Sequence, residues 1–375
     1  MREFRTALIY TTAYLPYIGG AELALKEITE RWHNVRVLIV TARLSRTVPQ
    51  RERIGRAEVI RIGIGIPRVD KLLLAVFGKR AGERALKGSE PDCVWAIMAS
   101  YGALAALAYK RAHPRVSFIL TLQEGDTHEH IARRARFLGK RFREIFERAD
   151  AIQAISQYLA DWARDMGATA PITVIPNGVD IEKFRFRSWK SDSPQANPTS
   201  KSIELITTSR LVKKNAVDDI IRALAHLPET VTLEVVGDGV ERNNLKVLTL
   251  SLNLSSRVHF AGAIAPEEIP LALARADIFV RPSLSEGLGN SFLEAFAAGL
   301  PVIATPVGGI PDFLRDGETG WFAEVRNPES IAACVRYIIN PAHEEHVTHV
   351  TAAARALIEK DYTWESVMVR MGAIL

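Results

Sequence analysis

Two glutamates, Glu286 and Glu294, flank a loop of small residues in the segment SEGLGNSFLE at 285–294. Gly287 and Gly289 have no Cβ, so the backbone N–H groups of the loop can approach a ligand closely. An apolar, Ala-rich stretch follows and predicts a helix, and the N-terminus of a helix favours a bound negative charge. Because amides bind phosphate and carboxylates accept hydrogen bonds from hydroxyls, this segment is suited to a nucleotide-sugar.

A second segment suited to binding phosphate is the basic turn from Arg210 to Lys214, which follows a predicted strand. A diphosphate leaving group needs fixed cations near it, and a guanidinium binds phosphate oxygens in a fork. The structural alternative is an exposed basic turn that binds no ligand.

Gly19 and Gly20 lie between the first predicted strand and the first predicted helix. Glycines at such a position let backbone amides approach the phosphate end of a ligand. A tight strand-to-helix turn explains these two residues equally well when they are considered alone.

The elements that carry these segments alternate between short apolar strands and helices. Such alternation predicts a parallel α/β sheet, and it occurs twice along the chain. Expected strands in the first half are residues 7–11, 35–41, 94–99, 118–122 and 151–155, with helices at 21–32 and about 133–148. Expected strands in the second half are residues 205–209, 232–236, 258–260, 278–281 and 302–305, with helices at about 217–227, 242–250, 267–275 and 293–299.

The alternation is interrupted at residues 185–202, which are polar and rich in Pro, Ser and Asn, as expected of a linker. We therefore expect an α/β protein with two Rossmann-like parallel-sheet domains facing across a cleft. The N-terminal domain would cover residues 1–184 and be joined by a C-terminal helix at about 362–375, and the C-terminal domain would cover residues 203–361. A chain of 375 residues is long enough for two such domains.

The composition is that of a soluble globular protein, with 47% hydrophobic and 24% charged residues. The chain has no run of 18 apolar residues, so no transmembrane helix is expected. The apolar run after Glu3 is short and is interpreted as a first buried strand rather than a signal peptide. Cys93 and Cys334 lie far apart among apolar neighbours, which is typical of buried thiols in a reducing cytosol, so we expect a cytoplasmic protein.

The net charge of +5 is unevenly distributed. Residues 1–200 carry 32 Lys and Arg against 21 Asp and Glu, whereas residues 201–375 carry 16 against 22. Such an excess indicates that the first half faces an anionic partner. Two basic runs with apolar neighbours, 71–80 and 133–143, either hold a helix against anionic lipid headgroups or form solvated helix faces. The charge excess favours a peripheral position on the inner face of the cell membrane or an anionic, lipid-linked substrate, and no nucleic acid is expected.

Further motifs occur along the chain in a definite order. They are YIGGAE (17–22), IPNGVD (175–180), SRLVKK (209–214), VGDG (236–239), VHFAG (258–262), ADIFVRPS (276–283), GLPVIAT (299–305), VGGIP (307–311), DGETG (316–320) and WE (364–365). With the glutamate segment, this series resembles the retaining GT-B glycosyltransferases of glycosyltransferase family 4. The resemblance covers nearly the whole chain, and the joint occurrence of the motifs is specific although each motif alone is weak.

That resemblance implies roles for individual residues. Glu286 would contact hydroxyls of the donor sugar, Glu294 would contact the ribose of the nucleotide, and Arg210 with Lys214 would stabilise the leaving diphosphate. The N-terminal domain would bind the acceptor and the C-terminal domain the donor. Glu286, Arg210 and Lys214 are the expected catalytic residues. Further donor-binding residues are expected to be Gly19, Gly20, Gly237, Gly287, Leu288, Gly289, Asn290 and Ser291.

The chain departs from the family pattern at two places. The lysine that the family carries five residues after the arginine falls on Asn215, and the glycine that follows it is Ala216, so Lys214 is the expected substitute. In the segment TLQEGDTH (121–128), Gln123 stands near a position where many family members have a histidine. An amide cannot accept a proton at neutral pH, so general-base catalysis from Gln123 is excluded.

The same segment supplies the candidates for the acceptor side of the site, which are Gln123, Glu124, Asp126 and His128. The sequence HEH at 128–130 does not predict a metal site, because histidines two residues apart on a helix face different ways. No Asp-x-Asp triplet occurs in the chain, which argues against a metal-bridged diphosphate. We therefore expect no metal and no cofactor, with a UDP- or GDP-sugar as the donor.

Together these features predict a metal-independent, retaining hexosyltransferase. It would move a sugar from a nucleoside diphosphate to a hydroxyl of a lipid-linked or polysaccharide precursor of the cell envelope. A nicotinamide or flavin dehydrogenase is not expected, because no Gly-x-Gly-x-x-Gly occurs at a strand-to-helix turn. Two alternatives remain, a non-catalytic sugar-nucleotide-binding scaffold and a GT-B sugar-nucleotide epimerase. Asn215 and Gln123 favour the scaffold, whereas the two glutamates and Arg210 oppose it.

Overall fold

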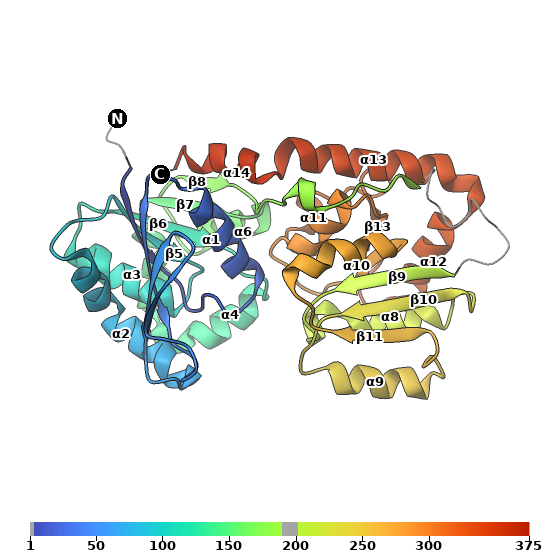
Figure 1. Cartoon of the computed structure of the whole chain (residues 1–375), viewed down its shortest axis with the longest axis horizontal. Helices are drawn as coiled ribbons and strands as arrows, with labels where there is room; N and C mark the ends of the chain where they lie inside the picture. Colours follow the sequence, from blue (N-terminus) through green and yellow to red (C-terminus); the bar gives the residue numbers. More distant parts are fainter. Residues whose placement is uncertain (1–3, 190–201, 375) are drawn as a thin grey trace. The chain divides into compact units, whose positions relative to one another are not determined.

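The computed structural model describes residues 4–189 and 202–374, which divide into two compact units (Figure 1). Among these residues, those up to Asn177 and those from Val367 onward form the first unit. The second unit runs from Gly178 to Ser366. Most of the predicted linker, residues 190–201 of 185–202, lies outside the described residues.

The first unit contains one sheet with the strand order β3-β4-β2-β1-β5-β6-β7-β8. Neighbouring strands run parallel except β3 and β4, which form an antiparallel hairpin at one edge. The strands are β1 (Thr6–Tyr10), β2 (Arg36–Ala42), β3 (Arg51–Ile54), β4 (Ala57–Ile62), β5 (Cys93–Ile97), β6 (Ser117–Leu122), β7 (Ala151–Ala154) and β8 (Ile172–Val174). The helices are α1 (Gly20–Arg31), α2 (Pro67–Leu86), α3 (Tyr101–Ala112), α4 (His128–Ala135), α5 (Lys140–Glu147) and α6 (Gln157–Asp165).

The single helix predicted at about 133–148 is wrong, because the structure has two helices there, α4 and α5. A 3-10 turn at Arg136–Leu138 and Gly139 separate them. Gly139 has a φ of 52°, in the left-handed region that ends a right-handed helix.

The second unit also contains one sheet, and its strand order is β11-β10-β9-β12-β13-β14, with all neighbours parallel. The strands are β9 (Ile203–Thr208), β10 (Val231–Val236), β11 (Val258–Gly262), β12 (Ile278–Arg281), β13 (Val302–Ala304) and β14 (Trp321–Phe322). The helices are α8 (Val217–Leu224), α9 (Arg242–Ser251), α10 (Ile269–Arg275), α11 (Asn290–Ala297), α12 (Pro328–Ile338) and α13 (Glu344–Asp361), and α14 (Trp364–Met371) crosses the division between the units. The first strand of this unit, β9, lies inside the sheet, as in a Rossmann fold.

Helices lie against each sheet, and their apolar faces form the cores (Figure 1). In the second unit, Ile220 of α8, Leu245 of α9 and Ile331 of α12 belong to one buried cluster with strand residues Leu233 and Val280. Burying an aliphatic side chain of this size contributes about 2 kcal/mol. The predicted fold class, two Rossmann-like parallel-sheet domains, is confirmed, and each predicted strand is found within two residues of its expected bounds.

Candidate active site

The two predicted donor segments of the second unit leave adjacent strands at the point where the strand order reverses. β9 lies between β10 and β12. Arg210 follows the carboxyl end of β9, and Glu286 follows that of β12. In open α/β sheets, ligands bind outside the carboxyl ends of the strands at this reversal. The topology therefore brings the basic turn and the glutamate loop to the expected ligand position.

The loop that carries Arg210 is packed against the glycine loop after β10. Gly237 has a φ of +136°, and a Cβ there would lie only 1.9 Å from the carbonyl oxygen of Ser209. The backbone N–H of Leu211 donates to the carbonyl of Asp238 at 2.9 Å. Gly237 therefore allows the two loops to touch, and the side chain of Arg210 is exposed.

Asn215, where the family resemblance places a lysine, is buried and hydrogen-bonded on both sides. Its Nδ2 donates to the carbonyl of Arg210 at 2.6 Å, and its Oδ1 accepts from Nη2 of Arg281 at 3.3 Å. Ala216 has a φ of 48°. Glycine would adopt this left-handed conformation without strain, which is consistent with the glycine that the family resemblance implies at that position.

Glu286 is 8% exposed and forms an ion pair with Arg281, the last residue of β12. Its Oε2 lies 2.5 Å from Nη2 of Arg281, and its Oε1 accepts from the backbone N–H of Gly287 at 3.2 Å. Nη1 of Arg281 donates to Oγ of Ser291 at 2.6 Å, and the guanidinium lies over the ring of Phe292 at 5.4 Å. These contacts fix the Glu286 carboxylate in one orientation.

Arg281 is a site residue that the sequence analysis did not identify. The signal for it was a charged residue at the end of an otherwise apolar strand, directly before the glutamate loop. Its partner Asn215 lies 66 positions earlier in the chain, so the sequence pattern alone could not join them.

The helix that follows the loop begins at Asn290 rather than at the predicted residue 293. Gly289, with a φ of +85°, is its N-cap residue. Glu294 therefore lies a full turn inside α11 and not at its start. Burial raises the pKa of Glu294 to about 7, and the positive charge of Arg281 opposes that shift. At neutral pH this carboxyl group is divided between its protonated and ionised forms.

Other predicted donor residues of the second unit lie in or beside the same loop. Lys214 belongs to a 3-10 turn, and its carbonyl accepts from the backbone N–H of Leu284 at 2.6 Å, which places the turn beside the glutamate loop. The side chain of Leu288 is buried, so only its backbone is available to a ligand. The backbone of Glu286 is packed against Gly308, where a Cβ would lie 1.8 Å from the Glu286 carbonyl oxygen.

Gly19 and Gly20 belong to the first unit. Gly19 is the N-cap residue of α1 and Gly20 is its first residue, directly after the loop that follows β1. The strand order of the first sheet reverses between β1 and β5. Oγ1 of Thr12, after β1, donates to Oγ of Ser100, after β5, at 2.9 Å. The glycines therefore lie on one of the two loops at the ligand position of their own sheet.

The acceptor candidates occupy the loop after β6. Glu124 is buried, and its Oε1 accepts from the backbone N–H of Ala99 at 2.5 Å. Burial raises the pKa of Glu124 to about 7, although that hydrogen bond opposes the shift. Oε1 of Gln123 accepts from Nδ2 of Asn177 at 3.2 Å, and Asp126 is partly exposed on the same loop.

His128, the fourth acceptor candidate, packs against aromatic side chains. Its ring stacks on Tyr158 at 4.2 Å and on Trp162 at 5.0 Å, both on α6. Burial lowers the pKa of His128 and so favours the neutral ring. In these contacts the ring of His128 packs against the aromatic side chains of α6. Within residues 4–189 and 202–374, no three His, Cys, Asp or Glu side chains are grouped so that they could hold a metal ion.

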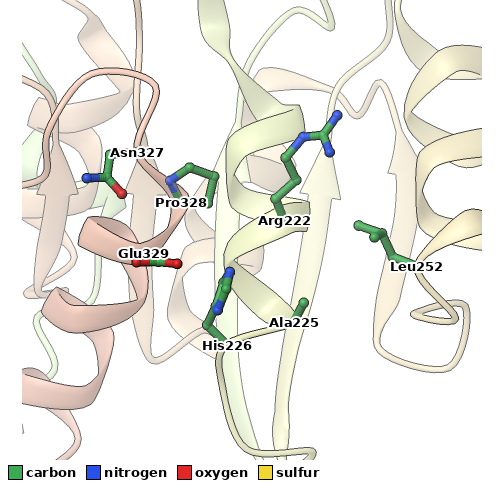
Figure 2. Close-up of a pocket in the computed structure, with 7 residues that line it drawn as sticks. All are labelled: Arg222, Ala225, His226, Leu252, Asn327, Pro328 and Glu329. Atoms are coloured by element: carbon green, nitrogen blue, oxygen red, sulfur yellow. The ribbon is translucent and has the colours of Figure 1, made fainter.

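A surface pocket of about 340 Å³ lies elsewhere on the second unit (Figure 2). Arg222 and His226 reach it from α8 and the residues just after it, and Asn327 to Glu329 line it from the start of α12. None of the predicted donor residues lines this pocket, so it plays no part in the candidate site.

Two family models match this chain. The model described as Glycosyltransferase Family 4 matches residues 18–183, and the model described as Glycosyl transferases group 1 matches residues 190–356.

Two curated relatives match part of the chain. The chain is 27% identical over 245 residues to the GDP-mannose-dependent alpha-(1-6)-phosphatidylinositol monomannoside mannosyltransferase of Mycobacterium tuberculosis. The matched region covers 62% of this chain and 63% of that protein. The chain is 34% identical over 195 residues to a lipopolysaccharide core biosynthesis glycosyltransferase of Rhizobium meliloti, and the matched region covers 52% of this chain and 55% of that protein. Each match thus spans less than two thirds of the relative's own length.

Solved structures resemble the whole chain in fold. Sucrose-phosphate synthase from Thermosynechococcus elongatus has a TM-score of 0.83 at 20% identity, over 99% of this chain and 98% of that chain. HepE of Anabaena in complex with UDP-glucose has a TM-score of 0.79 at 20% identity, over 98% of both chains. At this identity the likeness is one of fold.

Proposed function

Because the chain belongs to the GT-B glycosyltransferases, with its two halves matching family 4 and group 1, we propose that it is itself a glycosyltransferase. In this proposal it transfers a hexose from a nucleoside-diphosphate sugar to a hydroxyl acceptor and retains the configuration of the anomeric carbon. The observation that supports the proposal is that the segments carrying Arg210 and Glu286 follow the adjacent strands β9 and β12 at the strand reversal of the second sheet.

Each of these residues has a distinct task in the proposed reaction. Arg210 is exposed at a strand end, where its guanidinium can bind the diphosphate. Glu286 accepts hydrogen bonds from hydroxyls of the sugar, and Glu294 accepts them from the ribose. Lys214, the glycine amides and the N-terminus of α11 stabilise the leaving group without a metal.

Retention follows from attack on the same face of the sugar as the departing phosphate. The acceptor oxygen forms the new bond to the anomeric carbon, the bond to the phosphate oxygen breaks, and the phosphate oxygen takes the acceptor proton. A double displacement would need a carboxylate close to the anomeric carbon. Glu286 is instead held by Arg281, as expected for a residue that binds hydroxyls.

The names of the related proteins support the choice of substrates. The mycobacterial relative is GDP-mannose-dependent, and the Anabaena structure holds UDP-glucose, so we propose a UDP- or GDP-sugar as the donor. Two relatives act in phosphatidylinositol mannoside and lipopolysaccharide core synthesis, so we propose a lipid-linked or polysaccharide precursor as the acceptor. The loop after β6, with Glu124 and Asp126, is the proposed acceptor side.

We further propose a peripheral site on an anionic membrane. No helix in the described part of the chain is long and apolar enough to cross a bilayer. Phe137 is 87% exposed in the middle of the basic run, and Arg133, Arg134 and Arg136 are exposed beside it. An exposed aromatic ring among arginines suits a surface of anionic lipid headgroups.

A donor screen tests the proposed function. The purified protein is mixed with UDP-, GDP- and ADP-sugars, and the release of nucleoside diphosphate and the transfer of labelled sugar to a crude lipid extract are measured. One donor should be consumed, and Glu286→Gln should lose that turnover. If donors bind but none releases nucleoside diphosphate or transfers its sugar, the result would instead favour the non-catalytic scaffold. Asn215 and Gln123 are the residues that favour this alternative.

A further inference from the structure

We propose that Arg281 supplies the buried positive charge of the donor site in this chain, in place of a lysine at position 215. In this role it is a positioning residue that holds the carboxylate of Glu286. Its effect on turnover rests on the function proposed above, whereas the location of the charge does not.

The first support is the set of partners that surround the guanidinium. Arg281 donates to Glu286 at 2.5 Å, to Ser291 at 2.6 Å and to Asn215 at 3.3 Å. These partners come from the glutamate loop, from α11 and from the turn after β9. Only 11% of the Arg281 side chain is exposed, so the charge is held among these groups rather than in solvent.

The second support is the identity of residue 215. Oδ1 of Asn215 is an acceptor for Arg281, and Nδ2 donates to the carbonyl of Arg210, so the amide links the two arginine-bearing segments. A lysine ammonium at this position would stand next to the guanidinium, and like charges at such a separation repel strongly in a partly buried site. Asn215 and Arg281 thus form a compatible pair, whereas lysine and Arg281 would not.

The third support is electrostatic. The charge of Arg281 lowers the pKa of Glu294 against the effect of burial, so it acts on both glutamates of the site. One buried cation near two carboxyl groups makes the site less anionic, which favours the approach of a diphosphate. Lys214, the rival source of charge, lies on a partly exposed turn that meets the glutamate loop through its backbone carbonyl.

Moving the charge back to position 215 tests the proposal. Arg281→Met removes the cation, Asn215→Lys adds a second one, and the double variant restores a single cation at the other position. For the donor that the wild-type protein consumes among UDP-glucose and GDP-mannose, each single variant should lower kcat/KM by about 100-fold. The double variant should recover at least about tenfold over Arg281→Met, because the two changes are coupled.

Two controls separate this role from general damage. Arg315→Met removes an exposed arginine that is paired with Glu318, and it should leave turnover unchanged. Arg281→Lys keeps the charge without the fork, so it should retain more turnover than Arg281→Met. If Arg281 only stabilised the conformation of the glutamate loop, the double variant would recover no kcat/KM over Arg281→Met.

A second measurement needs no substrate. Asn215→Lys should lower the thermal unfolding midpoint by about 4 °C when Arg281 is present and should leave it unchanged in the Arg281→Met background. If the wild-type protein consumes no donor, the proposed function is wrong, and this thermal cycle still decides where the charge lies. Equal destabilisation by Asn215→Lys in both backgrounds would overturn the proposal. So would turnover of Arg281→Met within threefold of wild type, with Lys214→Ala causing the larger loss.

Discussion

Glu286 has two oxygens with different surroundings, and this difference defines what the residue can do. Oε2 is occupied by Arg281, while Oε1 accepts only a long bond from the backbone N–H of Gly287. A hydroxyl that approaches the loop can therefore bond to Oε1 without breaking the ion pair. The arginine holds the carboxylate in its orientation before the ligand arrives, which lowers the cost of binding.

Removal of either charged group of the proposed donor site should abolish most turnover. Glu286→Gln keeps an acceptor for Arg281 but loses the negative charge, and Arg210→Ala loses the exposed guanidinium. Each should lower kcat/KM by about 100-fold in a coupled assay of nucleoside diphosphate release. Glu318→Gln, at an exposed glutamate of the same unit, is the matched control. Activity of both site variants near that of wild type would contradict the assignment.

Donor binding should depend on pH through Glu294. Its pKa is raised to about 7 by burial, so the carboxyl group becomes increasingly protonated as the pH falls from 8 to 6. A protonated carboxyl group is a weaker acceptor for ribose hydroxyls, and the affinity for the nucleotide should fall over the same range. Calorimetric titration at several pH values would measure this. Glu294→Gln should flatten the profile, and an unchanged slope in that variant would assign the dependence to another group.

At the residue level, a position in the site could be predicted where the residue type and its sequence neighbours indicate the chemistry. Glu286, Arg210 and their glycines were predicted from residue type together with the family resemblance, and the loops that carry them follow adjacent strands of the second sheet. Arg281 could not be predicted, because its role depends on Asn215, which tertiary structure brings beside it. His128 was a reasonable acceptor candidate by type, but its ring is stacked between aromatic side chains that no local pattern connects to it.

At the level of elements, buried strands were predictable because strands covered on both faces form continuous apolar runs. β3 was not expected, since the sequence RERI of this edge strand is mostly charged. The long basic helix was expected to be continuous, since the residues on either side of Gly139 favour helix. One glycine in the left-handed region was enough to divide it.

The contact between the β9 and β10 loops predicts the effect of a methyl group at Gly237. Gly237→Ala places Cβ against the carbonyl of Ser209 and forces a φ of +136° on alanine. The free energy of unfolding should fall by about 3 kcal/mol, and turnover should fall with it because the Arg210 loop is displaced. Gly317→Ala is the matched control, since Gly317 also has a positive φ but its nearest neighbour is 3.9 Å from the added Cβ. Denaturant unfolding of both variants would measure the difference, and equal losses would show that conformational strain alone matters.

For the whole molecule, the uneven charge of the two halves predicts where a membrane would bind. Replacing Arg133, Arg134 and Arg136 with serine removes three exposed charges beside Phe137. Each basic residue near an anionic bilayer contributes about 1 kcal/mol, so affinity for phosphatidylglycerol vesicles should fall roughly 100-fold in a sedimentation assay.

The control for this experiment lies in the same unit. Arg51, Arg53 and Arg56 are exposed at the β3–β4 hairpin, and their replacement by serine lowers the net charge equally. Loss of vesicle binding only in the first triple variant supports a specific surface. Equal loss in both would reduce the effect to net charge, and unchanged sedimentation would remove the membrane from the proposed function.

Because β9 and β12 lie inside their sheet, we expect their strand hydrogen bonds to open rarely. β9 is hydrogen-bonded to β10 on one side and to β12 on the other, and β12 is also bonded to β13. Amide protons in such strands exchange with deuterated solvent only when the whole unit unfolds, whereas edge strands exchange through local fraying. Arg210 and Glu286 lie on the loops that follow these two strands. Substitutions in their loops can therefore change which sugar is bound while the strands beneath them stay closed.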